Sequence, residues 1–309
     1  MEQRRSGRQK CSKGGEKLIR ISQLKLPITH TKAQLEKKIA KTLKNPGNSF
    51  TYEIRKQSLD CRHKNDKIFV YTVDVTIRDE QKLAKKVNNN NIMLTKEKPY
   101  EFPSPGETPL LHSPVIVGSG PAGLFCGWYL AKAGYCPIIL ERGEEAEKRQ
   151  KTVENFWKNG VLDPESNVQF GEGGAGTFSD GKLNTLVKDP YGRNHEVLKR
   201  FVAAGAPEEI IYQQKPHLGT DVLVGIVEKM RHEIEEMGGK FCFRSKVTDL
   251  IFENNTLKEI EINNDKRIPA QVCVLAPGHS ARDTFEMLQK RGVYMLSLIH
   301  ISEPTRRRG

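Results

Sequence analysis

The residues best suited to chemistry lie close together between positions 115 and 141. Three glycines, Gly118, Gly120 and Gly123, follow an apolar run and precede a helical pattern. The first permits a sharp turn, the second lets the backbone approach a pyrophosphate, and the third lets the helix lie close to a sheet. Amides at a helix start, with about half a positive charge from the helix dipole, attract phosphates. The segment therefore predicts a dinucleotide site formed by Gly118, Ser119, Gly120, Pro121, Ala122 and Gly123.

An acidic residue completes this unit. Glu141 ends a second apolar strand, and seventeen residues separate it from Gly123. A carboxylate at this position accepts hydrogen bonds from an adenosine ribose, and Arg142 beside it is a further candidate cofactor contact. Glycine triplets also occur in ordinary loops, so the alternative is a tight strand-to-helix turn without a ligand. The strand–loop–helix–strand context favours the nucleotide site.

A second glycine-rich segment lies further along the chain. Five glycines fall within the eleven residues from Gly171 to Gly181. We expect such a density where another group approaches the backbone closely, whereas simple flexibility is the alternative.

The order of elements predicts two domains. The pattern from 17 to 97 indicates a small α+β domain with an antiparallel sheet, in which Thr31 caps a helix carrying Leu35, Ile39 and Leu43. A proline-rich linker follows at 98–113. The segment 114–295 predicts an α/β domain with a parallel sheet, a helix over 220–237 capped by Thr220 or Asp221, and a meander. We expect the meander strands at 241–244, 247–252 and 257–262, and a buried strand at 272–276.

Charge is distributed unevenly along the 309 residues. Residues 1–112 contain 24 Lys and Arg against 12 Asp and Glu, whereas residues 113–309 contain 26 of each class. A basic module can bind nucleic acid. A solvated lysine-rich surface behind a disordered tail at 1–16 is the interpretation we favour, because no RNA-binding, basic-zipper or zinc-finger motif is present. RNA binding through residues 17–112 stays open as the alternative.

Cysteine usage and hydropathy indicate a cytoplasmic protein. The six cysteines form no CxxC pair, so we expect reduced core residues and no metal site. No apolar run approaches the ~18 residues that cross a bilayer, and the polar residues 1–16 do not form a secretory signal. We therefore expect no membrane association.

The order of these motifs resembles that of two-motif flavoproteins. Residues 118–124 are similar to their first motif, and Val274–Gly278 resembles their second, with Pro277 where threonine is common. Together with 171–183, 217–221 and 278–284, they resemble a bacterial family of FAD-dependent, or NAD(FAD)-utilizing, dehydrogenases over about residues 17–295.

This resemblance implies a Rossmann-like FAD-binding domain and an oxidoreductase of unknown substrate, with NAD(P)H as candidate electron donor. It places Ala276 and Gly278 near the cofactor. It also places the following residues against the flavin: Gly173, Gly174, Ala175, Gly176 and Thr177. A flavoprotein acting on RNA and a non-catalytic NAD-binding module are the alternatives.

No catalytic residue is assigned. Asp180 and Lys182 are candidate substrate or flavin contacts, although surface solvation explains either as well. His217 and His279 each precede a predicted helix and could act as acid or base, but capping or packing is the interpretation we favour.

The end of the chain departs from the family. Residues 296–306 resemble a translated sequencing adapter, so we exclude 296–309 from fold reasoning. The C-terminal Gly-Asp segment of such flavoproteins has no counterpart here. We therefore expect a longer native product, and we expect the 309-residue chain to be inactive and to retain FAD weakly or not at all.

Overall fold

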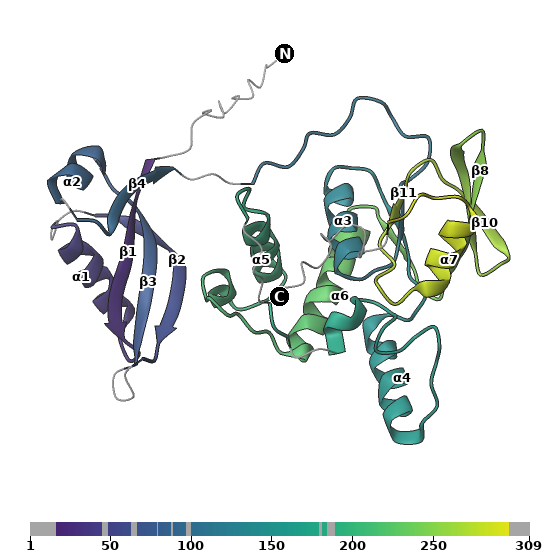
Figure 1. Cartoon of the computed structure of the whole chain (residues 1–309), viewed down its shortest axis with the longest axis horizontal. Coiled ribbons are helices and arrows are strands. Elements are labelled where there is room, and N and C mark those ends of the chain that lie inside the picture. The colour runs from purple at the N-terminus through teal and green to yellow at the C-terminus, as the bar shows by residue number, and fades with distance from the viewer. Residues whose placement is uncertain are drawn as a thin grey trace, which may run out of the picture. The chain divides into compact units, whose positions relative to one another are not determined.

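The chain forms two compact units, each described by itself below (Figure 1). The computed structural model describes residues 17–44, 49–62, 67–78, 80–87, 89–96, 100–178, 181–183 and 189–296. The predicted tail at 1–16 and residues 297–309 lie outside the described residues.

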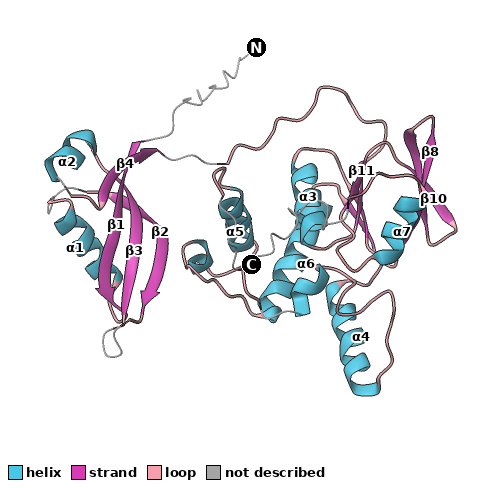
Figure 2. Ribbon diagram, in the orientation of Figure 1, coloured by secondary structure: helices cyan, strands magenta, loops and turns pink. Residues whose placement is uncertain are grey.

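The first unit contains a four-stranded antiparallel sheet of order β2-β3-β1-β4. Its strands are β1 (Lys17–Pro27), β2 (Thr51–Asp60), β3 (Ile68–Thr76) and β4 (Ile92–Lys96), and its helices are α1 (Lys32–Thr42) and α2 (Glu80–Val87). The order β-α-β-β-α-β with this sheet is the ferredoxin-like arrangement. Both helices lie on the same side of the sheet (Figure 2). The predicted α+β fold is confirmed.

Helix α1 forms where its sequence predicts it. Thr31 is the N-cap: its hydroxyl accepts a hydrogen bond from the Gln34 amide, and the Gln34 side chain accepts one from the Thr31 amide. This capping box satisfies two amides that would otherwise lack partners. Leu35, Ile39 and Leu43 follow at helical spacing and are all buried against the sheet.

The opposite face of the sheet carries a buried ion cluster. Asp74 on β3 is 3% exposed and accepts two hydrogen bonds from Arg20 and one from Arg55, each at 2.7 Å. Burial opposes the charge of Asp74, but the bonds from Arg20 and Arg55 outweigh it, so its pKa lies below the ordinary value. The charged side chains of this face therefore largely satisfy one another.

The first unit also includes a later part of the chain. Residues 183–203 and 207–217, with α5 (Arg193–Ala203) and the 3-10 helix η2 (Glu208–Ile211), group with it. The Gln57 amide donates to the Tyr212 carbonyl at 2.8 Å, and the Gln214 amide donates to the Gln57 carbonyl at 3.1 Å. These bonds join the segment to the edge strand β2 of the first unit. The predicted domain boundary instead placed the segment in the second domain, 114–295.

The second unit is built on a parallel sheet of order β11-β5-β6-β7. Its strands are β5 (Val115–Val117), β6 (Ile138–Leu140), β7 (Lys240–Cys242) and β11 (Cys273–Leu275). The helices are α3 (Pro121–Lys132), α4 (Ala146–Asn159), η1 (Gly174–Phe178), α6 (Thr220–Glu236) and α7 (Arg282–Lys290). Read in chain order, the strands are arranged 3-2-1-4, which is the Rossmann order. The predicted α/β fold class is confirmed.

A three-stranded meander packs on this sheet and has the order β10-β9-β8. It consists of β8 (Val247–Glu253), β9 (Thr256–Ile262) and β10 (Lys266–Pro269), and its apolar residues share a core with Val115, Val117 and Leu140. The prediction of a meander is confirmed, but its composition was wrong. The predicted meander strand at 241–244 instead belongs to the parallel sheet as β7, where Phe241 lies in register with Ile139 of β6. The third strand of the meander is β10.

Two local predictions were also wrong. The N-cap of α6 is Gly219, and no side chain caps that helix, because Thr220 and Asp221 are already helical. Cys61 and Cys136 are exposed rather than core residues, whereas burial raises the pKa of the Cys273 thiol to about 11. In the described part of the chain, no helix has the length and apolar content needed to cross a membrane.

We expect Asp74→Asn to destabilise the first unit by about 2 kcal/mol, because two guanidinium groups lose their buried counter-ion. Hydrogen exchange followed by mass spectrometry should show faster exchange in β1 and β3. Peptides from β5 and β6, which belong to the other unit, are the internal control. Since the folded pKa of Asp74 is depressed, its stabilisation should be present above about pH 4 and disappear as pH falls through the folded pKa. Unchanged exchange in β1 would contradict the assignment.

Candidate functional site

A cavity of ≈ 550 Å³ lies at the carboxyl ends of β5, β6 and β11. Strand order reverses between β5 and β11, and open α/β sheets bind ligands at this switch point. The predicted residues that line the cavity are Gly118, Gly120, Pro121, Ala122, Glu141, Arg142, Gly174, Ala175, Ala276 and Gly278. The predicted residues Ser119, Gly123, Gly173, Gly176 and Thr177 are not among its lining residues. Three motifs from distant parts of the sequence therefore meet at one cavity.

Close backbone packing explains two of the motif glycines. Gly118 has a φ of +99°, and a Cβ there would overlap the carbonyl of Ala276 on the neighbouring strand connection. A Cβ on Gly123 would overlap the Gly118 carbonyl. The turn out of β5 and the start of α3 thus require both glycines for packing alone.

Gly120 differs from them. It is the N-cap of α3 in extended backbone, with a φ of −65° and no side chain to cap the helix. A Cβ there would meet nothing nearer than the Gly174 Cα at 3.9 Å. The first amides of a helix have no intrahelical acceptor, so this helix start offers donors to a ligand in the cavity.

The second glycine-rich loop packs on the first. The Gly173 amide donates to the Ser119 carbonyl at 3.0 Å, and a Cβ on Gly174 would lie 3.2 Å from the Gly120 Cα. Close packing thus explains four of the five glycines in 171–181: Gly174 and Gly181 approach other backbone, and Gly171 and Gly173 approach the side chains of Arg149, Thr177 and Val227, whereas a Cβ on Gly176 would meet nothing within 4 Å. The alternative of simple flexibility is not needed for Gly171, Gly173 and Gly174, whereas Ser179 and Asp180 lie outside the described residues.

Arg149 on α4 holds this second loop, and the sequence analysis missed it. Its side chain is fully buried. Its guanidinium donates to the carbonyls of Asn167, Val168, Gly171, Glu172 and Gly174, and to the hydroxyl of Thr177, at 2.7–3.3 Å. Burial lowers the pKa of Arg149 to about 10, while Glu141 and Glu172 oppose this shift. The sequence did contain a signal for it: Arg149 lies at helical spacing from the apolar residues Ala146 and Val153, and all three are buried in α4.

Glu172 ties the same loop to two helices. One carboxylate oxygen accepts from the Ala146 amide at the start of α4, and the other accepts from Arg231 on α6, both at 2.8 Å. Burial raises the pKa of Glu172, while Arg231 and the Ala146 amide oppose this shift. The loop is therefore fixed from both sides by buried charged groups.

Glu141 lies in the cavity, as its position predicted, but it also bonds within the protein. Its Oε2 accepts from the Ser119 amide at 2.8 Å and from the Ser119 hydroxyl at 2.7 Å, and its Oε1 accepts from the Gly143 amide at 2.9 Å. A carboxylate has about four acceptor positions, so about one remains for a ligand. Ser119 does not line the cavity, but its two hydrogen bonds orient the Glu141 carboxylate.

Arg142 belongs to a four-residue ion cluster beside the cavity. It donates to Glu165 at 2.7 Å and to both oxygens of Asp283 at 2.9–3.0 Å, and Lys246 contacts the same two carboxylates at 2.7–3.0 Å. Burial opposes the charge of Asp283, but Arg142 and Lys246 outweigh it and depress its pKa. The two cations that line the cavity, Arg142 and Lys246, are thus already paired.

The remaining predicted residues are dispersed. His279 lines the cavity next to Ser280, whose hydroxyl lies 3.1 Å from His279 Nδ1. His217 is exposed and belongs to the first unit, and Lys182 is exposed. The start of α7 brings Ala281 and Thr284 to the cavity, so a second helix N-terminus faces it. The arrangement suits an anionic ligand held by backbone donors.

Comparison with protein families agrees with the two units. Residues 116–152 match the family described as NAD(P)-binding Rossmann-like domain. Residues 18–76 match a domain of unknown function, DUF8436. An uncharacterized protein of Clostridium beijerinckii is 44% identical over 278 residues, which are 90% of this chain and 52% of the relative. The chain spans about half the length of that relative.

Three solved structures are similar to part of this chain, each with a TM-score below 0.5. THI4 of Thermovibrio ammonificans has a TM-score of 0.40 and 21% identity, and the match covers 60% of this chain and 64% of that one. L-proline dehydrogenase of P. horikoshii has a TM-score of 0.33 and 16% identity, over 60% and 56% of the two chains. Thioredoxin reductase of Lactococcus lactis has a TM-score of 0.29 and 16% identity, over 53% and 34%.

We expect Gly123→Ala to lower the thermal unfolding midpoint of the second unit, because the new methyl group must displace the Gly118 backbone. Gly225→Ala is the matched control: a Cβ there meets nothing within 4 Å, and alanine in a helix should stabilise by about 0.5–1 kcal/mol. Differential scanning calorimetry compares the two. Equal midpoints would show that the helix start tolerates a side chain.

We expect Arg149→Met to release the 167–177 loop, since several buried carbonyls lose their donor and Glu172 loses a nearby positive charge. The cost should be about 3 kcal/mol or more. Limited proteolysis should then cleave within 167–178. Lys151→Met, on the exposed side of the same helix, is the control and should leave the pattern unchanged. Resistance of the Arg149 variant to cleavage would contradict this role.

Proposed function

We propose that the second unit binds FAD and forms part of a flavin-dependent oxidoreductase. The observation that carries the proposal is the meeting of two glycine loops, an acidic strand end and the Ala276–Gly278 turn around one cavity. A Rossmann-like match over 116–152 supports a dinucleotide ligand. The resemblance of the later motifs to two-motif flavoproteins favours FAD over NAD.

Gly120 supports the presence of a ligand most directly. Packing does not require glycine there, because a Cβ would meet no atom closer than 3.9 Å. A pyrophosphate does require it, since the phosphates approach the backbone at this residue. The amides at the start of α3 would hold the phosphates, and the free acceptor position of Glu141 would bind the adenosine ribose.

The other lining residues fit the remainder of such a cofactor. Gly174 and Ala175 expose backbone to the cavity, and Gly278 faces them from the β11 turn. A bound flavin would supply hydride or electron transfer, while the protein positions it and sets the local charge. The residues of this chain would bind and orient the cofactor and exclude water from it. We assign no catalytic acid or base, and we leave the substrate and the electron donor unnamed.

A non-catalytic NAD-binding module is the second candidate, because the matched family is described by NAD(P). Glu141 serves an unphosphorylated ribose in either ligand, so it does not separate them. Only the later motifs, 171–183 and Val274–Gly278, separate the two ligands, and their resemblance to flavoprotein motifs is why we prefer FAD.

We expect Gly120→Ala to fold normally but to weaken FAD binding by about tenfold or more, because the methyl group would occupy the space of the pyrophosphate. Isothermal titration calorimetry of the full chain with FAD, NAD⁺ and NADP⁺ measures this. Gly225→Ala is the control for an added methyl group far from the cavity.

Three results would overturn the proposal. They are a Clostridium beijerinckii relative that purifies without flavin and takes up no added FAD, tighter binding of NAD⁺ than of FAD by this chain, and unchanged FAD affinity in Gly120→Ala. The longer Clostridium beijerinckii relative provides the test of activity. It should carry flavin after purification, and its reduction by NADH or NADPH can be followed in the visible spectrum.

A further inference from the structure

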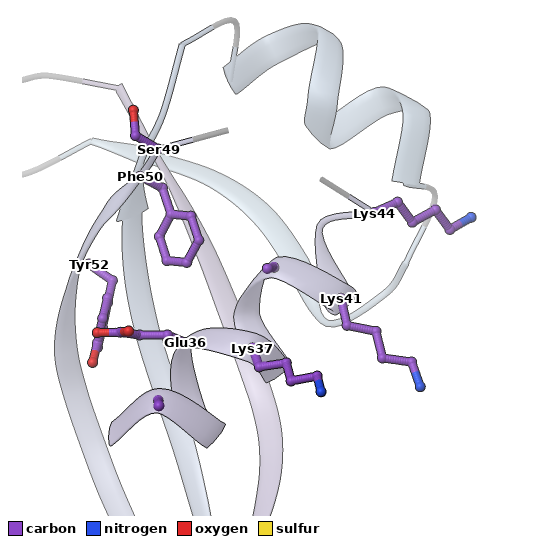
Figure 3. Close-up of a pocket in the computed structure, with 9 residues that line it drawn as sticks. Glu36, Lys37, Lys41, Lys44, Ser49, Phe50 and Tyr52 are labelled. Atoms are coloured by element: carbon purple, nitrogen blue, oxygen red, sulfur yellow. The ribbon is translucent and has the colours of Figure 1, made fainter. Parts of the chain in front are cut away.

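A second cavity lies in the first unit, where no role has been assigned. It is an open groove of ≈ 890 Å³ between α1 and the start of β2. The groove is lined by Ala33, Glu36, Lys37, Ala40, Lys41, Lys44, Ser49, Phe50 and Tyr52. Figure 3 shows the three lysine side chains extending outward from α1, away from the rings of Phe50 and Tyr52, which lie on the strand side of the groove.

The basic side of the groove is a row of three lysines. Lys37, Lys41 and Lys44 occur at i, i+4 and i+7, which places them on one side of α1 and its C-terminal end. Along a helix, Lys37 and Lys41 are separated by about 6 Å. All three are exposed, and none forms an ion pair with another described residue. Their charges are therefore available to an anion.

The strand side presents two aromatic rings. The centroids of Phe50 and Tyr52 lie 6.3 Å apart, and both residues are half-buried against the core. Glu36, the acidic residue of the groove, has its side chain directed toward the Tyr52 ring in Figure 3, and burial and the charge of Glu36 raise the pKa of Tyr52. The acid is thus turned toward the strand and away from the lysine row.

We propose that this groove binds single-stranded nucleic acid. A row of lysines beside aromatic rings is the combination that holds phosphates and stacks unpaired bases. The positive excess of the chain, 24 Lys and Arg against 12 Asp and Glu over residues 1–112, has the complementary sign. An acidic peptide would use the lysines but not the partly exposed faces of Phe50 and Tyr52, which also pack against the core, so we favour a ligand with bases.

The opposite face of the same sheet does not offer this chemistry. Ferredoxin-like domains of the RNA-recognition type stack bases on aromatic residues of the open sheet face. Here that face carries Arg20 and Arg55, both bonded to Asp74, and Glu53 beside His195 of α5. The groove on α1 is therefore the better candidate, and it lies in a different place from that of RNA-recognition domains.

Fluorescence anisotropy of the full chain with a labelled single-stranded RNA of mixed sequence tests the proposal. Lys37→Gln/Lys41→Gln/Lys44→Gln should weaken binding by about tenfold or more at low salt. The slope of log affinity against log salt should fall by about 2, because each lost phosphate contact on a single strand contributes about 0.7. Phe50→Leu keeps an apolar side chain in the core and should weaken binding by about fivefold.

The matched control is Lys32→Gln/Lys38→Gln/Lys56→Gln, which removes the same charge from exposed positions of the same unit outside the groove. It should change affinity by less than about threefold. A single-stranded DNA of the same sequence is the second arm, and tighter binding of RNA would identify a contact with the 2′-hydroxyl.

Equal losses in the two triple variants would overturn the assignment to the groove. Absence of binding at low salt, or equal affinity for a duplex of the same length, would overturn the ligand class. A polyglutamate peptide that competes as well as unlabelled RNA would show that only charge is recognised. That result would also overturn the ligand class. Because FAD binding is measured separately on the other unit, failure of either proposal leaves the other intact.

Discussion

The site depends on the close approach of two stretches of bare backbone. The loop after β5 and the loop at 171–174 lie so near each other that Gly173 donates to the Ser119 carbonyl. Such contact restricts the second loop, because a Cβ on Gly174 would lie 3.2 Å from the Gly120 Cα, and it leaves many carbonyls to be satisfied away from water. The buried guanidinium of Arg149 satisfies those carbonyls. One arginine thus supplies hydrogen-bond donors to several carbonyls of a glycine-rich loop.

Charge balance around that arginine explains why two acids are buried beside the cavity. Arg149 remains protonated at neutral pH, because its pKa of about 10 is still well above 7. Glu141 and Glu172 interact electrostatically with Arg149, and Glu172 also accepts a hydrogen bond from Arg231. Removing either partner of a buried pair leaves an uncompensated charge. Glu141 therefore has a structural task in addition to any contact with a ligand.

The sequence predicted what depends on local patterns and missed what depends on distant pairing. The glycine spacing located the turn after β5, the capping box located α1, and both fold classes were correct. The assignment of β7 was wrong because an apolar run of three residues does not reveal its partner strand. The bonds of residues 212–214 to Gln57 and the contacts of Arg149 with 167–177 join segments that no local pattern connects. The cofactor roles of the site residues stay predictions.

Not every residue of the glycine motif indicates a ligand equally directly. Gly118 and Gly123 are required by contacts with Ala276 and with each other, so both would be needed in an empty fold. Glu141 uses about three of its four acceptor positions within the protein. Gly120 has space for a side chain and no internal reason to lack one. At this cavity, Gly120 therefore bears on ligand binding more directly than Gly118 or Gly123 does.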